Sequence, residues 1–334
     1  MKEFETDRET GKLFAKKSPA NANILMLVFT FWTLFISILS VSLLYFGVLA
    51  IPISVLAAIG QVVGLFGGFV LFLLISKQKP RDVLMLKAPS GRNTILAILM
   101  GIAFVPIIIT ISIAIPILTS AIFPVEEVVA TAFAQEVPSL WVLLVIGAVF
   151  PAIFEEITYR GILFNQYGVG KNGVSISRVA FFTSLIFALA HGNTVQILYA
   201  LPFGMLFTYI LYYTRSIWMP IIIHFVTNAL AFILAFMQPP PEVTDTYVQA
   251  DALPSVWPMI LLFGAISLVL SPIIIFSMRK FKKDYNNTQP PPQEIEGQSE
   301  YTTKPKYFTW ALWLNIIILL VLTLLRDFGI LFQM

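Results

Sequence analysis

The chain has 334 residues, of which 58% are hydrophobic and only 12% are charged, with a formal net charge of +3 and no cysteine. Soluble domains carry about 25% charged residues, so this composition, with its mean hydropathy of +0.86, excludes a soluble globular protein. Without cysteine, the sequence can form neither disulfides nor thiolate metal sites. In membrane proteins, basic residues in the loops mark which side of the membrane a loop occupies. The calculated pI of about 9.0 therefore does not indicate nucleic-acid binding.

Runs of about 20 apolar residues, each long enough to cross a bilayer as a helix, follow one another along the chain. They predict an all-α polytopic membrane protein, a bundle of about 8–9 transmembrane helices. The expected spans are 24–46, 53–75, 94–122, 140–164, 175–191, 194–213, 217–237, 256–278 and 307–325. The first run begins after a mostly polar stretch and continues into a full span, so we expect no signal peptide.

Basic and acidic loops alternate between these spans. One set carries Lys12, Lys16, Lys17, Lys77, Lys79, Arg81, Lys87, Arg92, Lys171, Arg178, Arg215, Arg279, Lys280, Lys282 and Lys283. The other carries Glu126, Glu127, Glu136, Glu242, Asp245 and Asp251. Since basic loops stay in the cytoplasm, the pattern predicts a cytoplasmic N-terminus and an external C-terminus. The short loops and the lack of cysteine favour a prokaryotic plasma membrane.

The chain divides into four expected parts. These are a cytoplasmic tail (1–23), a helix bundle (24–283) with a catalytic core at about 140–232, a flexible cytoplasmic linker (284–306) and an accessory C-terminal helix (307–334). The linker is expected because residues 284–306 are polar and contain prolines. Glycines at 60, 64 and 68 form a face of small residues, which predicts close packing of this span against another helix.

Charged residues interrupt the fourth span in "PAIFEEITYR", residues 151–160. A charge near the bilayer centre costs at least about 2.5–3.5 kcal/mol and usually marks a functional site. Glu156 and Arg160 are four residues apart and can form an ion pair on one helix face. A purely structural ion pair would explain these two residues, but it leaves Glu155, about 100° away, without a reason. Pro151 frees the carbonyl of residue 147.

The two histidines of the chain, His191 and His224, both fall inside predicted spans. His224 and Asn228 share a helix face in "HFVTN", and Phe187 lies one turn before His191 in "FALAH". At 1.5 Å per residue from the cytoplasmic flanks, Glu155, His191 and His224 lie at depths of about 15, 20 and 13 Å. The spacing therefore predicts one polar site built from three helices.

A carboxylate and an imidazole around one water form a general-base arrangement for attack on a carbonyl, and a nearby asparagine or histidine can stabilise the oxyanion. Burial disfavours the ionised form of Glu155, whereas Arg160 favours that of Glu156. This asymmetry suggests Glu155 as the base and Glu156 as its support, although the two glutamates could exchange roles. His191, His224 and Glu155 also match the three protein ligands of a catalytic zinc, so the sequence leaves a zinc and a metal-independent mechanism equally open.

Glu155-Glu156-x-x-x-Arg160, Phe187-x-x-x-His191 and His224-x-x-x-Asn228 together resemble the three motifs of the CPBP family, which comprises CAAX prenyl proteases, bacteriocin-processing enzymes and Abi proteins. The resemblance covers residues 140–232 and implies an intramembrane endopeptidase with a cavity open to the cytoplasm. By the same resemblance, Glu155 activates water with His191. His224 and Asn228 stabilise the oxyanion, while Glu156 and Arg160 support the site.

The implied partners are membrane lipids and a peptide or protein substrate, which is prenylated in eukaryotic relatives. Two other functions fit the same residues. A bacteriocin-immunity or membrane scaffold protein could keep the fold without catalysis. A proton-coupled transporter also buries acidic groups and histidines, but the chain shows no inverted repeat of the kind that transporters carry.

Overall fold

The computed structural model describes residues 14, 17–48, 53–119, 137, 139–170, 173–237, 253–288 and 305–327. In these ranges the regular elements are helices, three of them π-helical (labelled η). In chain order they are α1 (Pro19–Tyr45), α2 (Ile53–Gly60), η1 (Gln61–Phe66), α3 (Gly67–Ser76), α4 (Pro80–Val83), α5 (Gly91–Thr119), α7 (Leu140–Leu144), η2 (Val145–Val149), α8 (Phe150–Glu155), η3 (Glu156–Leu163), α9 (Phe164–Tyr167), α10 (Ile176–Leu189), α11 (Thr194–Thr214), α12 (Trp218–Phe236), α13 (Leu253–Thr288) and α14 (Trp310–Asp327).

The prediction of an all-α polytopic membrane protein is confirmed. Seven helices in the described part of the chain are long and apolar enough, by length and composition, to cross a membrane. The expected spans 53–75 and 175–191 coincide with the shorter apolar helices Gln61–Ser76 and Ile176–Leu189. The eighth expected span ends at residue 278, whereas α13 continues as a helix to Thr288.

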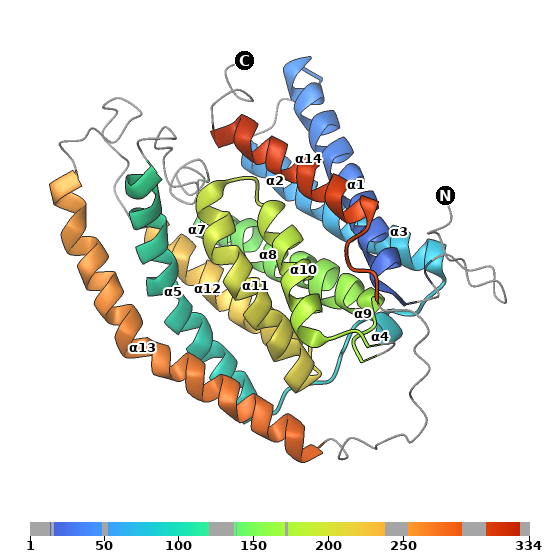
Figure 1. Cartoon of the computed structure of the whole chain (residues 1–334). Helices are drawn as coiled ribbons and strands as arrows, with labels where there is room; N and C mark the ends of the chain where they lie inside the picture. The colour runs from blue at the N-terminus through green and yellow to red at the C-terminus, as the bar shows by residue number, and fades with distance from the viewer. Residues whose placement is uncertain are drawn as a thin grey trace.

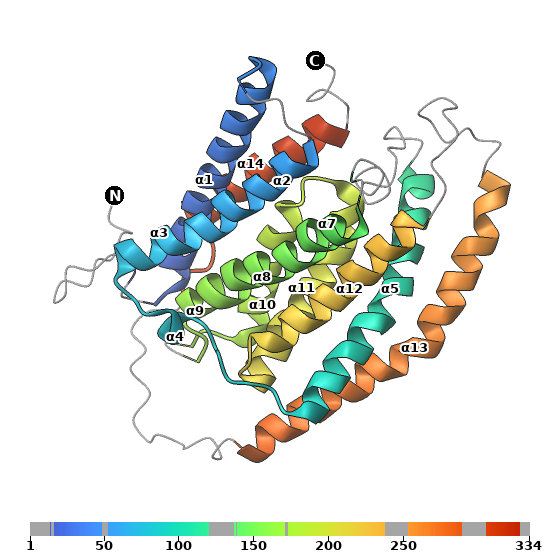
Figure 2. The same cartoon turned by 180° about the vertical axis from the view of Figure 1, so that it is seen from behind.

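The antiparallel pair α10 and α11 lies in the middle of the molecule, beside the broken helix that runs from α7 to α9 (Figures 1 and 2). On one side α12 packs against α5, and α5 packs against α13. On the other side α1 packs against α14 and η1. Buried apolar side chains form one cluster around α1, η3, α10 and α14 and a second around α5, α11 and α12. The charged residues of the fourth span therefore lie between two packed layers.

Local sequence explains how α1 begins and how it packs against η1 and α3. Ser18 caps α1 by accepting a hydrogen bond from the backbone N–H of Asn21 at 3.2 Å, and Pro19 occupies the first helical position. The predicted close packing at the glycine face is confirmed at two of its glycines. A Cβ on Gly68 would lie 2.6 Å from the ring of Phe29, and one on Gly64 would lie 3.4 Å from Thr33. Glycine at these positions lets α1 approach closely.

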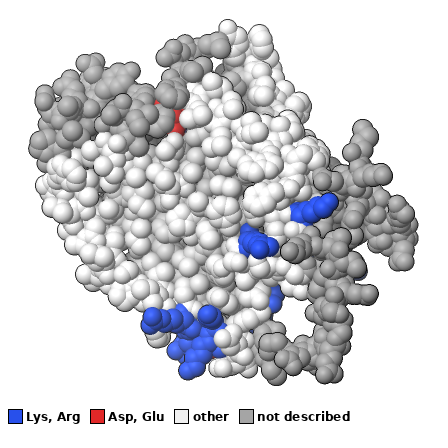
Figure 3. Space-filling model, in the orientation of Figure 1, with Lys and Arg blue, Asp and Glu red and all other residues white. Residues whose placement is uncertain are grey.

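Basic side chains in view lie from the end of α13 at the bottom towards the right of the molecule, a small acidic patch lies near the top, and the surface between them is uncharged (Figure 3). This end of α13 carries Arg279, Lys280, Lys282 and Lys283. The acidic residues that oppose them in the sequence (Glu126, Glu127, Glu136, Glu242, Asp245 and Asp251) lie outside the described residues, as do residues 1–13 of the expected tail and 289–304 of the expected linker.

Candidate active site

The first motif lies where α8 changes into the π-helix η3. Glu155 ends α8, and Glu156 begins η3. Arg160, one turn later, donates from Nη1 to Glu156 Oε1 at 3.1 Å, so the ion pair expected from the spacing is present. The side chains of Glu156 and Arg160 are 0% and 1% exposed. Single π-helical turns recur at functional sites in other proteins, and here such a turn holds a buried ion pair.

Aromatic rings and a glycine hold the Arg160 guanidinium in place. It stacks over the ring of Phe187, with 4.2 Å from Cζ to the ring centroid, and lies 5.6 Å from that of Phe207. A Cβ on Gly204 of α11 would lie 2.9 Å from Arg160 Nη2, so glycine leaves the room that the guanidinium fills. Within the described part of the chain, Arg160 Nε and Nη2 have no hydrogen-bond partner.

His224, on α12, lies between the two glutamates. Its Nδ1 is 3.0 Å from Glu156 Oε1, and its Nε2 is 3.9 Å from Glu155 Oε2. Since an ionised carboxylate only accepts hydrogen bonds, the short contact places a proton on Nδ1. Nε2 then faces Glu155 at 3.9 Å, beyond direct hydrogen-bond distance, so that a water beside the pair could contact both groups. Glu155 Oε2 is buried and has no hydrogen-bond partner among the described residues.

Asn228 lies one turn after His224 and donates from Nδ2 to the carbonyl of Gly147 at 3.3 Å. This carbonyl is the one that Pro151, four residues later, cannot satisfy because proline has no N–H. Gly147 itself is required by packing, because a Cβ there would lie 2.6 Å from the ring of Phe232. The contact fixes the orientation of the Asn228 amide and leaves its second N–H free to donate.

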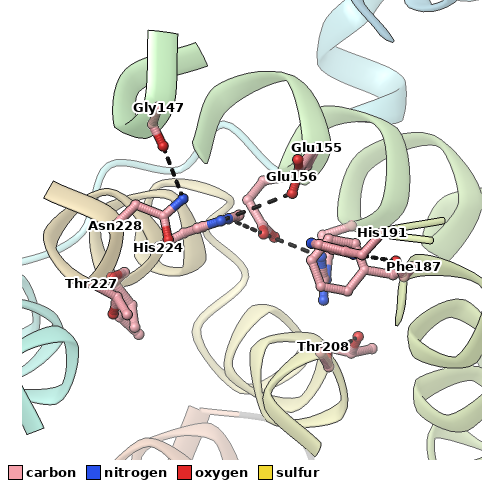
Figure 4. Close-up of polar contacts among 12 residues, drawn as sticks. Gly147, Glu155, Glu156, Phe187, His191, Thr208, His224, Thr227 and Asn228 are labelled. Carbon is pink, nitrogen blue, oxygen red and sulfur yellow. Dashed lines mark hydrogen bonds and ion pairs between the residues drawn. The ribbon is translucent and has the colours of Figure 1, made fainter. Parts of the chain in front are cut away.

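His191 follows the last turn of α10. Its Nδ1 is 2.8 Å from the carbonyl oxygen of Phe187, which only accepts, so Nδ1 carries the proton and Nε2 is an acceptor. The ring of Phe187 lies edge-on to both imidazoles, with centroids 4.7 Å from His191 and 6.5 Å from His224. Figure 4 shows His224 directed at the two glutamates, Asn228 at Gly147, and His191 beside Phe187.

The contacts thus gather the candidate residues of all three motifs around the ring of Phe187: Glu155, Glu156, Arg160, His191, His224 and Asn228. It places His224, rather than His191, opposite Glu155. Sequence reasoning missed Gly204 and Phe207, which enclose Arg160, because one sequence does not show which glycine or phenylalanine of α11 faces that side chain.

A metal would need its ligands to converge. Both histidines are oriented through Nδ1 by an oxygen, as metal-ligating histidines are. However, the described residues contain no group of three or more His, Cys, Asp or Glu side chains placed to hold one ion. His191, His224 and Glu155 therefore do not fit a three-ligand site as they lie.

A cavity of about 200 Å³ begins beside this cluster. Ala190 and Gly192, on either side of His191, line it together with Thr158 and Tyr159 of η3. Its other walls come from α1, η1, α10 and α14, and they are mostly apolar. The cavity is therefore a neighbour of the polar cluster on the side of His191, although its lining contains none of the six motif residues.

One comparison identifies the region. Residues 137–230, from just before α7 into α12, match the family model described as type II CAAX prenyl endopeptidase, Rce1-like. No curated protein and no solved structure matches the chain. The matched region contains every residue of the three motifs. Over residues 137–230, this multi-pass integral membrane protein is therefore similar to the Rce1-like type II CAAX prenyl endopeptidases, which matches the resemblance to the CPBP family.

Proposed function

We propose that the protein is an intramembrane endopeptidase that hydrolyses a peptide bond with a water activated by Glu155. The observation that carries this proposal is the pairing of Glu155 with His224. A buried carboxylate oxygen without a hydrogen-bond partner among the described residues lies 3.9 Å from an imidazole nitrogen, too far for a direct hydrogen bond, and one water beside the pair could contact both. The family of residues 137–230 is a protease family, which supports a peptidase.

The reaction uses the chain's own groups. Glu155 accepts a proton from the water, whose oxygen attacks the carbonyl carbon of the scissile bond. The negative charge that develops on the carbonyl oxygen is stabilised by a hydrogen bond from the second N–H of Asn228. His224 Nε2 donates a further hydrogen bond when that imidazole carries a second proton. Glu155 then gives its proton to the leaving nitrogen, so that the products are a carboxylic acid and an amine.

The remaining motif residues hold these groups in position. Glu156, anchored by Arg160, accepts from Nδ1 of His224 and so directs Nε2 at the water. The carbonyl of Phe187 orients His191 through Nδ1. We propose that His191 Nε2 is a second acceptor for the protons of the water. Glu156, Arg160 and the carbonyl of Phe187 contribute by holding the two imidazoles in a productive orientation, without contacting the substrate.

We further propose that the substrate enters from the cytoplasmic side and carries a prenyl group near its C-terminus. The cavity beside His191 supports this, because its mostly apolar walls suit a hydrocarbon chain while the peptide backbone reaches the glutamates. Thr158 and Tyr159, which lie two and three residues after Glu156, contribute to the cavity wall. The same helix, η3, would therefore contact the prenyl group of the substrate and support the site that cleaves its peptide bond.

The test is cleavage of matched quenched peptides, prenylated and unprenylated, by purified full-length protein in detergent. Glu155→Gln keeps size and hydrogen bonding but removes the base, so kcat should fall by about 10²-fold or more while the melting temperature is unchanged. Asp284→Asn is the matched control, because this carboxylate pairs with Lys280 on α13, away from the site. Wild-type activity in Glu155→Gln would refute the mechanism.

Two further arms separate the alternatives. Cleavage that survives a chelator and is lost in Glu155→Gln supports the metal-independent mechanism, whereas loss to chelator with recovery on adding zinc assigns His191 and His224 as ligands. A wild-type protein that cleaves neither peptide, with Glu155→Gln silent in cells, would favour a binding or immunity role.

A further inference from the structure

The C-terminal helix α14 reaches the turn that carries His191. Asp327, in the last turn of α14, is 8% exposed and accepts hydrogen bonds at Oδ2 from the backbone N–H of Thr194, at 3.2 Å, and from the Thr194 hydroxyl. Thr194 is the first residue of α11 and lies three residues after His191. The contact joins parts of the chain separated by 133 residues, one inside and one outside the matched domain.

The segment between α10 and α11 depends on few bonds of its own. His191 and Gly192 donate backbone N–H bonds to Ala188 and Leu189, both at 3.1 Å, and Gly192 has a φ of +67°, in the left-handed region that favours glycine. On the other side, Asn193 caps α11 by accepting from the backbone N–H of Gln196 at 2.8 Å.

Asp327 adds the one carboxylate that the structure brings to the start of α11 within the described residues. An anion there satisfies an otherwise unpaired first-turn N–H and interacts favourably with the helix dipole. Losing it would leave the half-buried Thr194 with an unpaired donor and let the short turn before it shift. A shift of about 1 Å in a catalytic group can cost about 10²-fold in rate.

We propose that Asp327 is a positioning residue of the active site, and that α14 holds the His191 turn in place through Thr194. This inference rests on the proposed function, in which His191 faces the attacking water. It makes the C-terminal helix part of the working site although the family match ends at residue 230.

Steady-state cleavage by full-length variants tests the proposal. Asp327→Ala and Thr194→Val should each lower kcat by about tenfold or more with KM within about twofold of wild type. Thr194→Ser keeps the hydroxyl and should keep kcat. Because the two residues act through one contact, the double variant should be no slower than the slower single variant.

The control is Thr309→Val at the opposite end of α14. Thr309 accepts from Asn23 Nδ2 at 3.0 Å and from the backbone N–H of Leu312 at 3.3 Å, so its loss weakens the helix without touching the His191 turn. Thr309→Val should lower the melting temperature and keep kcat. A loss of kcat in Asp327→Ala no greater than in Thr309→Val would overturn the proposal.

A second readout does not need activity. The chain has no cysteine, so a nitroxide attached to Ala190→Cys reports on this turn alone. Asp327→Ala should raise the mobility of the nitroxide and Thr309→Val should not. Unchanged mobility in Asp327→Ala overturns the proposal, whatever the cleavage result. Raised mobility in Asp327→Ala, in a protein that cleaves no peptide, would support the role of Asp327 in holding the His191 turn and would reject the proposed function.

Discussion

At the scale of single residues, the amide group of Asn228 can donate two hydrogen bonds at once, one structural and one to the oxyanion. One N–H is donated to the carbonyl of Gly147 at 3.3 Å, which fixes the side chain, and the other is left for the oxyanion. Asn228→Ala should therefore lower kcat by about 10²–10³-fold with little change in KM, as measured for other oxyanion donors. The measurement is steady-state kinetics on the cleaved peptide.

Thr227 provides the control from the same turn of α12. Its hydroxyl donates to the carbonyl of Ile223 at 2.8 Å and approaches that of Gly101 at 3.2 Å, so it faces α5 rather than the glutamates. Thr227→Val should keep kcat near that of wild type. If both variants lost activity equally, the packing of α12 rather than an oxyanion contact would explain the effect.

Phe187 shows how an apolar residue organises charged ones. Its carbonyl orients His191, one face of its ring carries the Arg160 guanidinium at 4.2 Å, and its ring lies edge-on to both imidazoles. Because a ring has fixed geometry and few rotamers, it keeps the distances between groups that would otherwise move independently. The aromatic position of the second motif thus connects the first motif to the third.

At the scale of elements, the approach of α11 to η3 depends on Gly204. A Cβ there would lie 2.9 Å from Arg160 Nη2 and 2.9 Å from both Cβ and Oγ of Ser184, so the guanidinium and the Ser184 side chain would have to shift. Gly204→Ala should therefore lower stability by about 1–3 kcal/mol, the usual cost of overpacking. It should also lower kcat, because the guanidinium that anchors Glu156 is displaced.

Gly264 on α13 is the matched control, because a Cβ added there would meet no atom within 4 Å. Gly264→Ala should leave kcat unchanged and raise the melting temperature slightly, as alanine favours a helix over glycine. Thermal unfolding in detergent and peptide cleavage measure both effects. Equal activity of Gly204→Ala and Gly264→Ala would contradict the role given to Gly204.

Helical spacing predicted much of the site at this scale and missed one feature. The four-residue spacing gave the ion pair between Glu156 and Arg160, and the missing N–H of Pro151 pointed to the carbonyl that Asn228 now contacts. The π-helix η3 was not predicted, because a short widened segment of eight residues leaves much the same apolar pattern as an α-helix. The residues could therefore be placed on a common face without knowing the helix type.

At the scale of the whole molecule, composition and apolar runs were enough to predict a multi-pass helical bundle, because each span must satisfy its own backbone in lipid. They could not predict which spans pack together. The contacts of α14 with α1 and with the start of α11 join residues far apart in sequence, and a membrane helix carries no periodic signal for its partner. For this reason nothing in the sequence indicated that Asp327, just beyond the expected span 307–325, contacts the start of α11.

The last prediction concerns how α14 is attached to the bundle. Thr30 of α1 donates from Oγ1 to Asn315 Oδ1 at 2.8 Å, and both side chains are buried. Thr30→Val leaves that oxygen buried without a donor, which should cost about 1–3 kcal/mol. Asn315→Leu should cost less, because the Thr30 hydroxyl can turn to a carbonyl of its own helix and because Asn315 Nδ2 has no hydrogen-bond partner among the described residues to lose.

Replacing both partners by apolar side chains of similar size should restore most of the loss, because neither helix then buries an unpaired polar atom at this contact. Thermal unfolding of wild type, both single variants and the double variant completes the cycle. A double variant that unfolds as easily as Thr30→Val would show that the hydrogen bond itself, and not the penalty of an orphaned oxygen, holds α14 to α1. Full recovery would instead mean that apolar packing attaches the helix and that the polar pair selects its register.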